Sequence, residues 1–160
     1  MKQLLLLALL LILFKGEDAV AQSDKAMLIL NDSTTLQLER VAFVAAEHKL
    51  TYTGSAVTAI DGEPYFGSDG DVPRHRLTKA VLKVNDDYYY LQVDRMFNPW
   101  SDYPDSDWYT ITRQGLQLVL RATFSDGAGY YGAEWILKDK KSTRTLLTDD
   151  ESILIEYFEN

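Results

Sequence analysis

The sequence predicts an all-β fold: a single-domain antiparallel β-sandwich or small barrel of about eight strands, with a possible short C-terminal helix. Apolar and polar residues alternate over residues 77–84 and 116–124, as expected of strands with one buried face. Polar turn residues separate such stretches at near-regular spacing, which is typical of a strand meander. Residues 22–160 suffice for one domain with a real core but are too few for two comfortable ones.

The first 21 residues are expected to be a secretory signal peptide and not part of the fold. An unbroken apolar run over residues 4–14 follows Lys2, and Ala19-Val20-Ala21 offers a cleavage site before Gln22. The run is shorter than the roughly 20 apolar residues that span a bilayer. The pattern therefore predicts an exported protein, periplasmic or extracellular, with no membrane span after leader removal. The charges over residues 15–18 depart from the usual pattern.

Strands are also expected in the N-terminal half of the domain, although their pattern is weaker. Residues 26–30, 34–46 and 48–60 carry apolar and β-branched side chains at partly alternating positions. A helical segment over residues 39–50 is the alternative for part of this region.

The C-terminal half alternates more clearly. Two strands flank the polar residues 85–87 and predict a hairpin. Leu116, Leu118, Leu120, Ala122 and Phe124 share one face of the next strand, and further strands follow over residues 130–138 and 142–148. The tail is ambiguous between a last strand and a helix. Thr148 and Glu151 fit a capping box, which favours a short helix.

The net charge and the lack of cysteine argue against several classes of partner and of catalytic chemistry. The net charge is −8, which argues against nucleic acid and anionic lipid as partners, because both need clustered Lys and Arg. Acidity favours a cationic partner, but it also simply keeps a protein soluble. The chain contains no Cys, so disulfides, thiol catalysis and thiolate metal sites are excluded.

The segment NPWSDYPDSDWY, over residues 98–109, is the first candidate site. It is longer than the two to five residues usual for hairpin loops, and two prolines restrict its backbone. Its aromatic rings and carboxylates could contact a protein or glycan partner. The competing interpretation makes its Trp residues a lid over the core and its Asp residues turn caps. The candidate partner-binding residues are Trp100, Asp102, Tyr103, Asp105, Asp107 and Trp108.

A second acidic loop and a basic triplet lie earlier in the chain. No cofactor is expected, apart from a weak possibility of calcium on the Asp residues of loop 98–109 or on the acidic cluster of residues 61–71. Neither segment has the spacing of a known calcium loop, and the metal ligands stay unknown. The triplet Arg74-His75-Arg76 could hold an anion, although a solvated strand start is the simpler interpretation.

Few residues offer catalysis, because the chain has only two His and lacks a nucleophile-elbow or zinc-protease motif. We therefore expect an exported, non-enzymatic binding or interaction module that recognises a protein or glycan partner through loop 98–109. One alternative is an inhibitor or immunity-type protein that blocks a cationic exported enzyme, such as a cell-wall hydrolase. The other is a small hydrolase that uses paired carboxylates.

Overall fold

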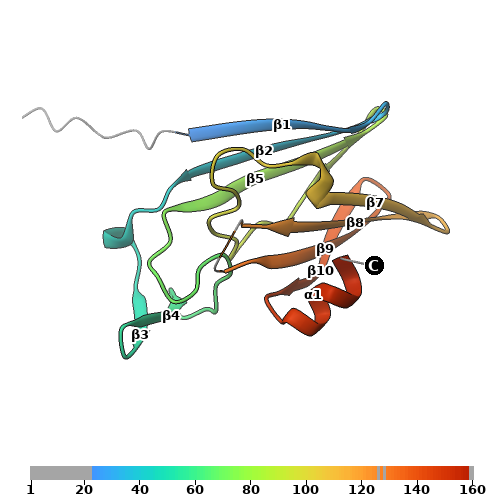
Figure 1. Cartoon of the computed structure of the whole chain (residues 1–160). Helices are drawn as coiled ribbons and strands as arrows, with labels where there is room; N and C mark the ends of the chain where they lie inside the picture. The colour runs from blue at the N-terminus through green and yellow to red at the C-terminus, as the bar shows by residue number, and fades with distance from the viewer. Residues whose placement is uncertain (1–22, 126, 128, 159–160) are drawn as a thin grey trace, which may run out of the picture.

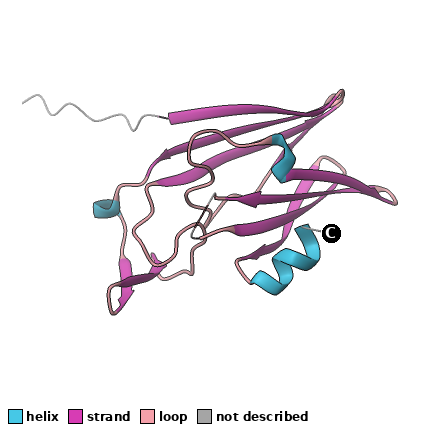
Figure 2. Cartoon of the chain, in the orientation of Figure 1, coloured by secondary structure: helices cyan, strands magenta, loops and turns pink. Residues whose placement is uncertain are grey.

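The computed structural model describes residues 23–158 except residues 126 and 128. These residues form ten strands and a short C-terminal helix, which confirms the predicted antiparallel all-β class and its C-terminal helix (Figures 1 and 2). The strands number ten where about eight are expected, and the two larger sheets do not close into a barrel. The predicted signal peptide and its cleavage before Gln22 lie outside the described residues.

The first sheet has four strands in the order β1-β2-β5-β6. Their bounds are β1 Ser23–Asn31, β2 Thr34–Ala42, β5 His75–Val84 and β6 Asp87–Tyr90. The predicted hairpin therefore forms between β5 and β6. The helical alternative for residues 39–50 is wrong except for one 3-10 turn, η1 Ala45–Glu47, because β2 continues to Ala42 as a paired strand.

The second sheet is the predicted meander, with the order β10-β9-β8-β7. Its strands are β7 Tyr109–Gln114, β8 Gln117–Phe124, β9 Tyr131–Lys138 and β10 Lys141–Thr148. Leu116 is expected on the inward face, but it lies in the turn between β7 and β8 and is 90% exposed. Strand β8 begins only at Gln117, so Leu116 belongs to the turn and does not follow the alternation of the strand.

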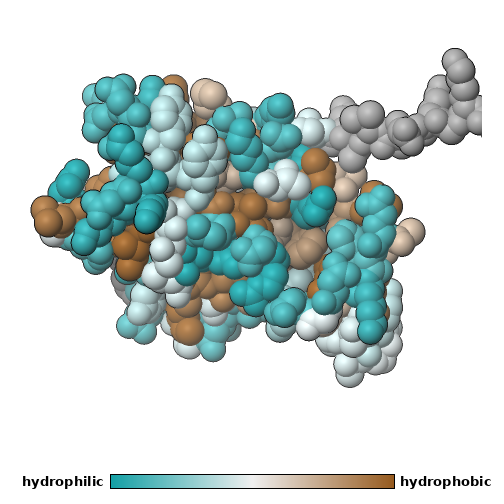
Figure 3. Space-filling model, turned by 180° about the vertical axis from the view of Figure 1, so that it is seen from behind, coloured by the Kyte–Doolittle hydropathy of each residue, from teal (hydrophilic) through white to brown (hydrophobic). Residues whose placement is uncertain are grey.

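The core lies between the two sheets, because each sheet turns one alternating set of side chains toward the other. Leu36, Leu38 and Leu82 come from the first sheet, and all three are fully buried. Phe124 and Trp135 of the second sheet belong to the same core. Figure 3 shows the molecule from behind, where hydrophobic residues are visible in separate patches among hydrophilic ones.

Helix α1, Glu151–Phe158, covers the outer face of the second sheet (Figure 1). A Cβ atom at Gly132 of β9 would lie 2.6 Å from the Phe158 ring and 2.8 Å from Leu154, so glycine permits this approach. The predicted capping box is wrong. The carboxylate of Asp150 accepts the backbone N–H groups of Ser152 and Ile153, at 2.9 and 3.4 Å, and so caps the helix.

A separate hairpin projects from one end of the molecule (Figure 1). It consists of β3 Leu50–Thr53 and β4 Ala56–Ile60. Val57 and Ile60 form a small second core with Phe97, which belongs to the segment between β6 and β7. Within the described part of the chain, no helix is long and apolar enough to cross a membrane.

Candidate functional site

Loop 98–109 forms the second part of the connection between the two sheets, ends at the first residue of β7 and contributes side chains to the core. Trp100 is 3% exposed and belongs to the main core, and Pro99 and Pro104 are fully buried. Trp108 is half-buried against the same core. These four side chains therefore fit the lid interpretation of the loop better than a contact surface.

A buried arginine fixes this loop to the first sheet. Arg40 of β2 is 6% exposed, and its guanidinium lies 4.5 Å from the centroid of the Trp100 ring. It donates hydrogen bonds to the Trp100 carbonyl and, at 3.0 Å, to the Ser101 carbonyl. It also pairs with the carboxylate of Asp24 at 3.3 Å. Sequence reasoning missed Arg40, because its position in β2 gives no local signal that a distant loop will cover it.

Tyr103 is exposed but has hydrogen-bond partners. Its hydroxyl accepts the backbone N–H of Met27 at 3.1 Å and donates to the Met27 carbonyl at 3.2 Å. Met27 lies on β1, an edge strand, whose outer edge would otherwise present unpaired backbone groups. Tyr103 therefore occupies part of that edge.

The three loop carboxylates do not converge. Asp105 accepts the backbone N–H of Asp107 at 3.0 Å and caps the 3-10 turn η2 Ser106–Trp108. Asp102 and Asp107 border two different hollows. Across residues 23–158, apart from residues 126 and 128, no group of three His, Asp or Glu side chains is placed to hold a metal ion. The convergence that a calcium site needs is thus not found there, either in this loop or in the cluster over residues 61–71.

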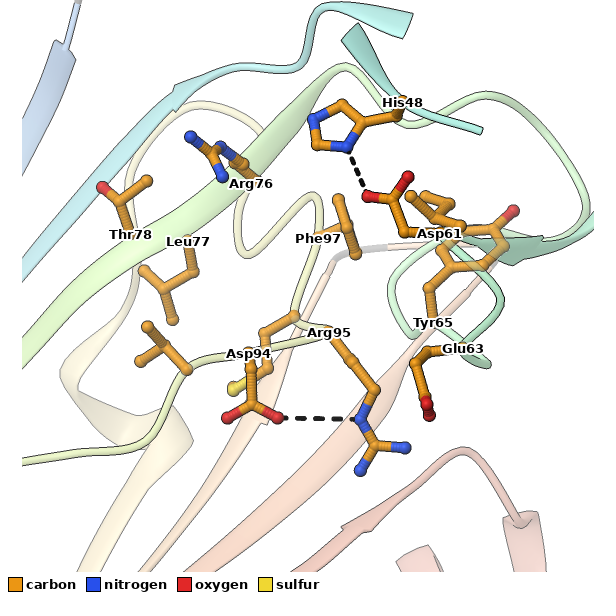
Figure 4. Close-up of a pocket in the computed structure, with 13 residues that line it drawn as sticks. His48, Asp61, Glu63, Tyr65, Arg76, Leu77, Thr78, Asp94, Arg95 and Phe97 are labelled. Carbon is orange, nitrogen blue, oxygen red and sulfur yellow. Dashed lines mark hydrogen bonds and ion pairs between the residues drawn. The ribbon is translucent and has the colours of Figure 1, made fainter. Parts of the chain in front are cut away.

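A different part of the chain forms a hollow with a largely apolar lining. We call it the hairpin pocket: a cavity of about 540 Å³ between β4 and the end of η1 on one side and β5 with residues 93–97 on the other (Figure 4). Its apolar lining consists mainly of Ile60, Leu77, Val93, Met96 and Phe97. The charged or titratable residues at its border are His48, Asp61, Glu63, Tyr65, Arg76, Asp94 and Arg95.

A His–Asp pair fixes one border of the pocket. His48 Nδ1 lies 2.6 Å from a carboxylate oxygen of Asp61, whose other oxygen accepts the Lys49 N–H at 2.8 Å. The His48 ring also stacks on Phe43, with 4.7 Å between centroids. The hydrogen bond with His48, and then the one from Lys49, lower the pKa of the Asp61 carboxyl. Asp61 therefore joins the chain before β3 to the end of β4.

A second set of charges is neutralised at the opposite border. The Arg144 guanidinium of β10 lies 2.7 Å from the Asp94 carboxylate, and Arg95 lies 3.7 Å from the same group. Burial raises the pKa of Asp94, but hydrogen bonding and the positive charge of Arg144 outweigh burial and lower it. Asp94 is thus held as an anion.

Two other charged residues at the border of the pocket have no hydrogen-bonded or oppositely charged partner among the described side chains. Within the described chain, the side chains of Arg76 and Glu63 have neither a hydrogen bond nor an ion pair. Figure 4 shows them on opposite sides of the pocket, with Phe97 between them. Both belong to segments that the sequence singled out, the basic triplet over residues 74–76 and the acidic loop, but only the fold brings them to one cavity.

This geometry suits binding better than acid–base chemistry. Glycoside hydrolysis requires a carboxylic acid whose pKa is raised, whereas the pKa values of Asp61 and Asp94 are lowered. His48 hydrogen-bonds Asp61, but none of the described Ser or Thr hydroxyls is hydrogen-bonded to its ring, so the pair lacks an evident nucleophile.

Comparisons of the chain with models of known protein families, with curated proteins and with solved structures gave no match.

Proposed function

We propose that the protein is an exported, non-enzymatic binding module that recognises its partner in the hairpin pocket. The observation that carries the proposal is the combination of an apolar lining with unpaired charged groups in a cavity of about 540 Å³. Ligand sites are typically concave, largely apolar hollows of this order of size, with a few polar groups that fix orientation.

The proposal places recognition in the pocket instead of in loop 98–109. Trp100 supports the core, Asp105 caps a turn, and the Tyr103 hydroxyl is occupied by the backbone of β1. These roles leave Asp102 and Asp107 as the loop's exposed carboxylates without a role in the fold described above. The pocket, in contrast, has apolar surface that a partner's side chain would remove from water.

NMR chemical-shift mapping tests this proposal. The ¹⁵N-labelled chain of residues 22–160 would be titrated with a set of short peptides and, separately, with a set of oligosaccharides. We expect at least one probe to shift the backbone amides of Leu77, Met96 and Phe97. Shifts confined to residues 98–109, or no shifts with either set, would contradict the proposal.

A matched pair of variants separates pocket binding from general effects. Thr78→Trp places a large ring at an exposed position that borders the pocket, whereas Leu116→Trp places the same ring in the distant β7–β8 turn. Thr78→Trp should abolish the shifts and Leu116→Trp should retain them. Thermal unfolding of both variants verifies that each is folded.

A further inference from the structure

The outer face of the first sheet departs from the usual alternation of buried apolar and exposed polar residues. A strand with one solvated face normally turns polar side chains outward. In the two outermost strands, β1 and β6, the outward residues are instead aliphatic or aromatic, and they are between 51% and 72% exposed: Met27, Ile29, Tyr88 and Tyr90. Single exposed apolar residues are ordinary, but several on one face mark an interaction surface.

The strand register arranges these side chains in two rows across the sheet. Residues directly opposite each other in an antiparallel pair share a face. The first row consists of Met27, Gln37, Val81 and Tyr90, and the second of Ile29, Thr35, Lys83 and Tyr88. Neighbouring strands lie about 4.8 Å apart and successive outward residues about 7 Å apart, so the rows form one continuous surface. We call it the tyrosine–lysine face.

The middle of this face is more polar than its two ends. The half-buried side chains of Thr35 and Gln37 bring a hydroxyl and an amide between the aliphatic residues of β1 and the tyrosines of β6. Hot spots of protein interfaces lie instead near an apolar centre, and insertion into a lipid surface requires a continuous apolar face. The arrangement matches a sugar chain better, because sugar rings have apolar faces and polar hydroxyl edges.

The tyrosine–lysine face is also basic, although the chain as a whole is acidic. Lys79 and Lys83 point outward from β5, and Lys83 Nζ lies 5.7 Å from the centroid of the Tyr88 ring. Glu39 lies in the register between Lys79 and Lys25, and it pairs with Lys25 at 3.8 Å. One negative charge thus lies among three positive ones. Because salt screens exposed charges beyond about 8 Å, this local excess governs an anion that contacts the face.

From these observations we infer that the tyrosine–lysine face is a second binding surface, which takes an acidic polysaccharide built of uronic acid residues. Its sugar rings pack on Tyr88 and Tyr90. Its carboxylates pair with Lys79 and Lys83. Nucleic acid fits less well, because neutralising a phosphate backbone requires many clustered Lys and Arg. None of the residues of this face lines the hairpin pocket, so the inference does not depend on the proposed function.

Titration of the ¹⁵N-labelled chain of residues 22–160 tests the partner class. The probes are oligogalacturonate and oligoalginate, and methyl-esterified oligogalacturonate is the uncharged control. We expect at least one acidic oligosaccharide to shift the backbone amides of Gln37, Val81 and Tyr90. Oligogalacturonate should bind more tightly than its ester, and added salt should reduce this difference, because salt screens the attraction between carboxylates and lysines.

Single variants assign the contributions of ring and charge. Tyr90→Ala should weaken binding about ten-fold or more, as is usual when a central aromatic contact is lost. Lys83→Gln should weaken it about two- to five-fold, which is the range expected of an exposed ion pair. Tyr52→Ala and Lys138→Gln are the matched controls, because they remove the same side chains from exposed positions outside the face. Urea unfolding verifies that every variant is folded.

Several results would overturn the inference. Equal affinity for oligogalacturonate and its methyl ester would remove the role of charge, and shifts confined to the amides of the hairpin pocket would place the glycan elsewhere. Tighter binding at this face of poly-glutamate, oligothymidylate or phosphatidylglycerol vesicles would assign it to a protein, a nucleic acid or a membrane instead. Absence of shifts in the face amides with both acidic oligosaccharides would also overturn it and would leave the pocket proposal untouched.

Discussion

Replacing Trp100 by Ala gives the clearest test of what loop 98–109 does. The Trp100 ring is 3% exposed, lies in the main core and packs against the Arg40 guanidinium at 4.5 Å. Truncation removes the ring from both contacts. The Arg40 hydrogen bonds to the Trp100 and Ser101 carbonyls remain available, because they involve the backbone of the loop.

The expected loss of stability follows from burial. Truncation of a buried Phe or Trp costs about 3–5 kcal/mol, from lost transfer free energy and from the cavity left behind. The removed Arg40–Trp100 contact adds to this, since a desolvated cation–π pair contributes on the order of 1–2 kcal/mol. Because a domain of this size has roughly 5–15 kcal/mol in total, we expect Trp100→Ala to lose about a third or more of its stability.

Urea unfolding followed by circular dichroism measures this loss directly. Leu116→Ala is the control, because it also truncates an apolar side chain but at a 90% exposed turn, and it should change stability by less than about 0.5 kcal/mol. Tyr103→Phe should cost about 1 kcal/mol, through the hydrogen bonds of its hydroxyl to Met27. If Trp100→Ala lowered the free energy of unfolding as little as Leu116→Ala does, the lid interpretation would be refuted. The loop would then again be the candidate contact surface.

Three further outcomes are expected. Asp61→Asn should reduce stability at neutral pH, because a carboxyl with a lowered pKa stabilises the fold only while it is ionised. The stability of the variant should approach that of the wild type as the pH falls through the lowered pKa of Asp61, which lies below the ordinary value of 3.8. Urea unfolding at several pH values measures this difference. Millimolar calcium should leave the melting temperature equal to that in chelator, because no three described carboxylates converge on one point. A cation that bound the folded state at a hundredfold excess over Kd would instead add about 2.7 kcal/mol to the free energy of unfolding. Mass spectrometry of the natively expressed protein should find a chain that starts at or near Gln22, and an intact chain from Met1 in the cytosol would refute export.

The parts of the fold that the sequence predicts are those governed by local patterns. Alternation over residues 77–84 and 117–124 marks strands because each side chain's direction depends only on its place in the strand. The same pattern fails at Leu116, where a turn intervenes. The sequence alone does not distinguish Thr148 from Asp150 as the helix cap, because both side chains are good acceptors and the choice depends on where the helix begins.

The candidate site is less predictable because it depends on distant pairs. The Trp100 ring is buried, and the residue that contacts both its ring and its carbonyl, Arg40, lies sixty positions earlier in the chain. The sequence around Trp100 gives no sign of this partner. Likewise, composition identifies the triplet over residues 74–76, but only the register of β5 brings Arg76 to the hairpin pocket. His48 carries no local signal of its pairing with Asp61.

The bond between Tyr103 and β1 also has a consequence for the order of folding. Met27 and Tyr103 are separated by 76 positions, so this contact closes a long loop, and we expect it to form later than the adjacent β1–β2 hairpin. Before it forms, the backbone groups of Met27 on the outer edge of β1 have no partner and can pair with another chain. We therefore expect the backbone groups of Met27 to be accessible to another chain in a newly made molecule until the tyrosine docks.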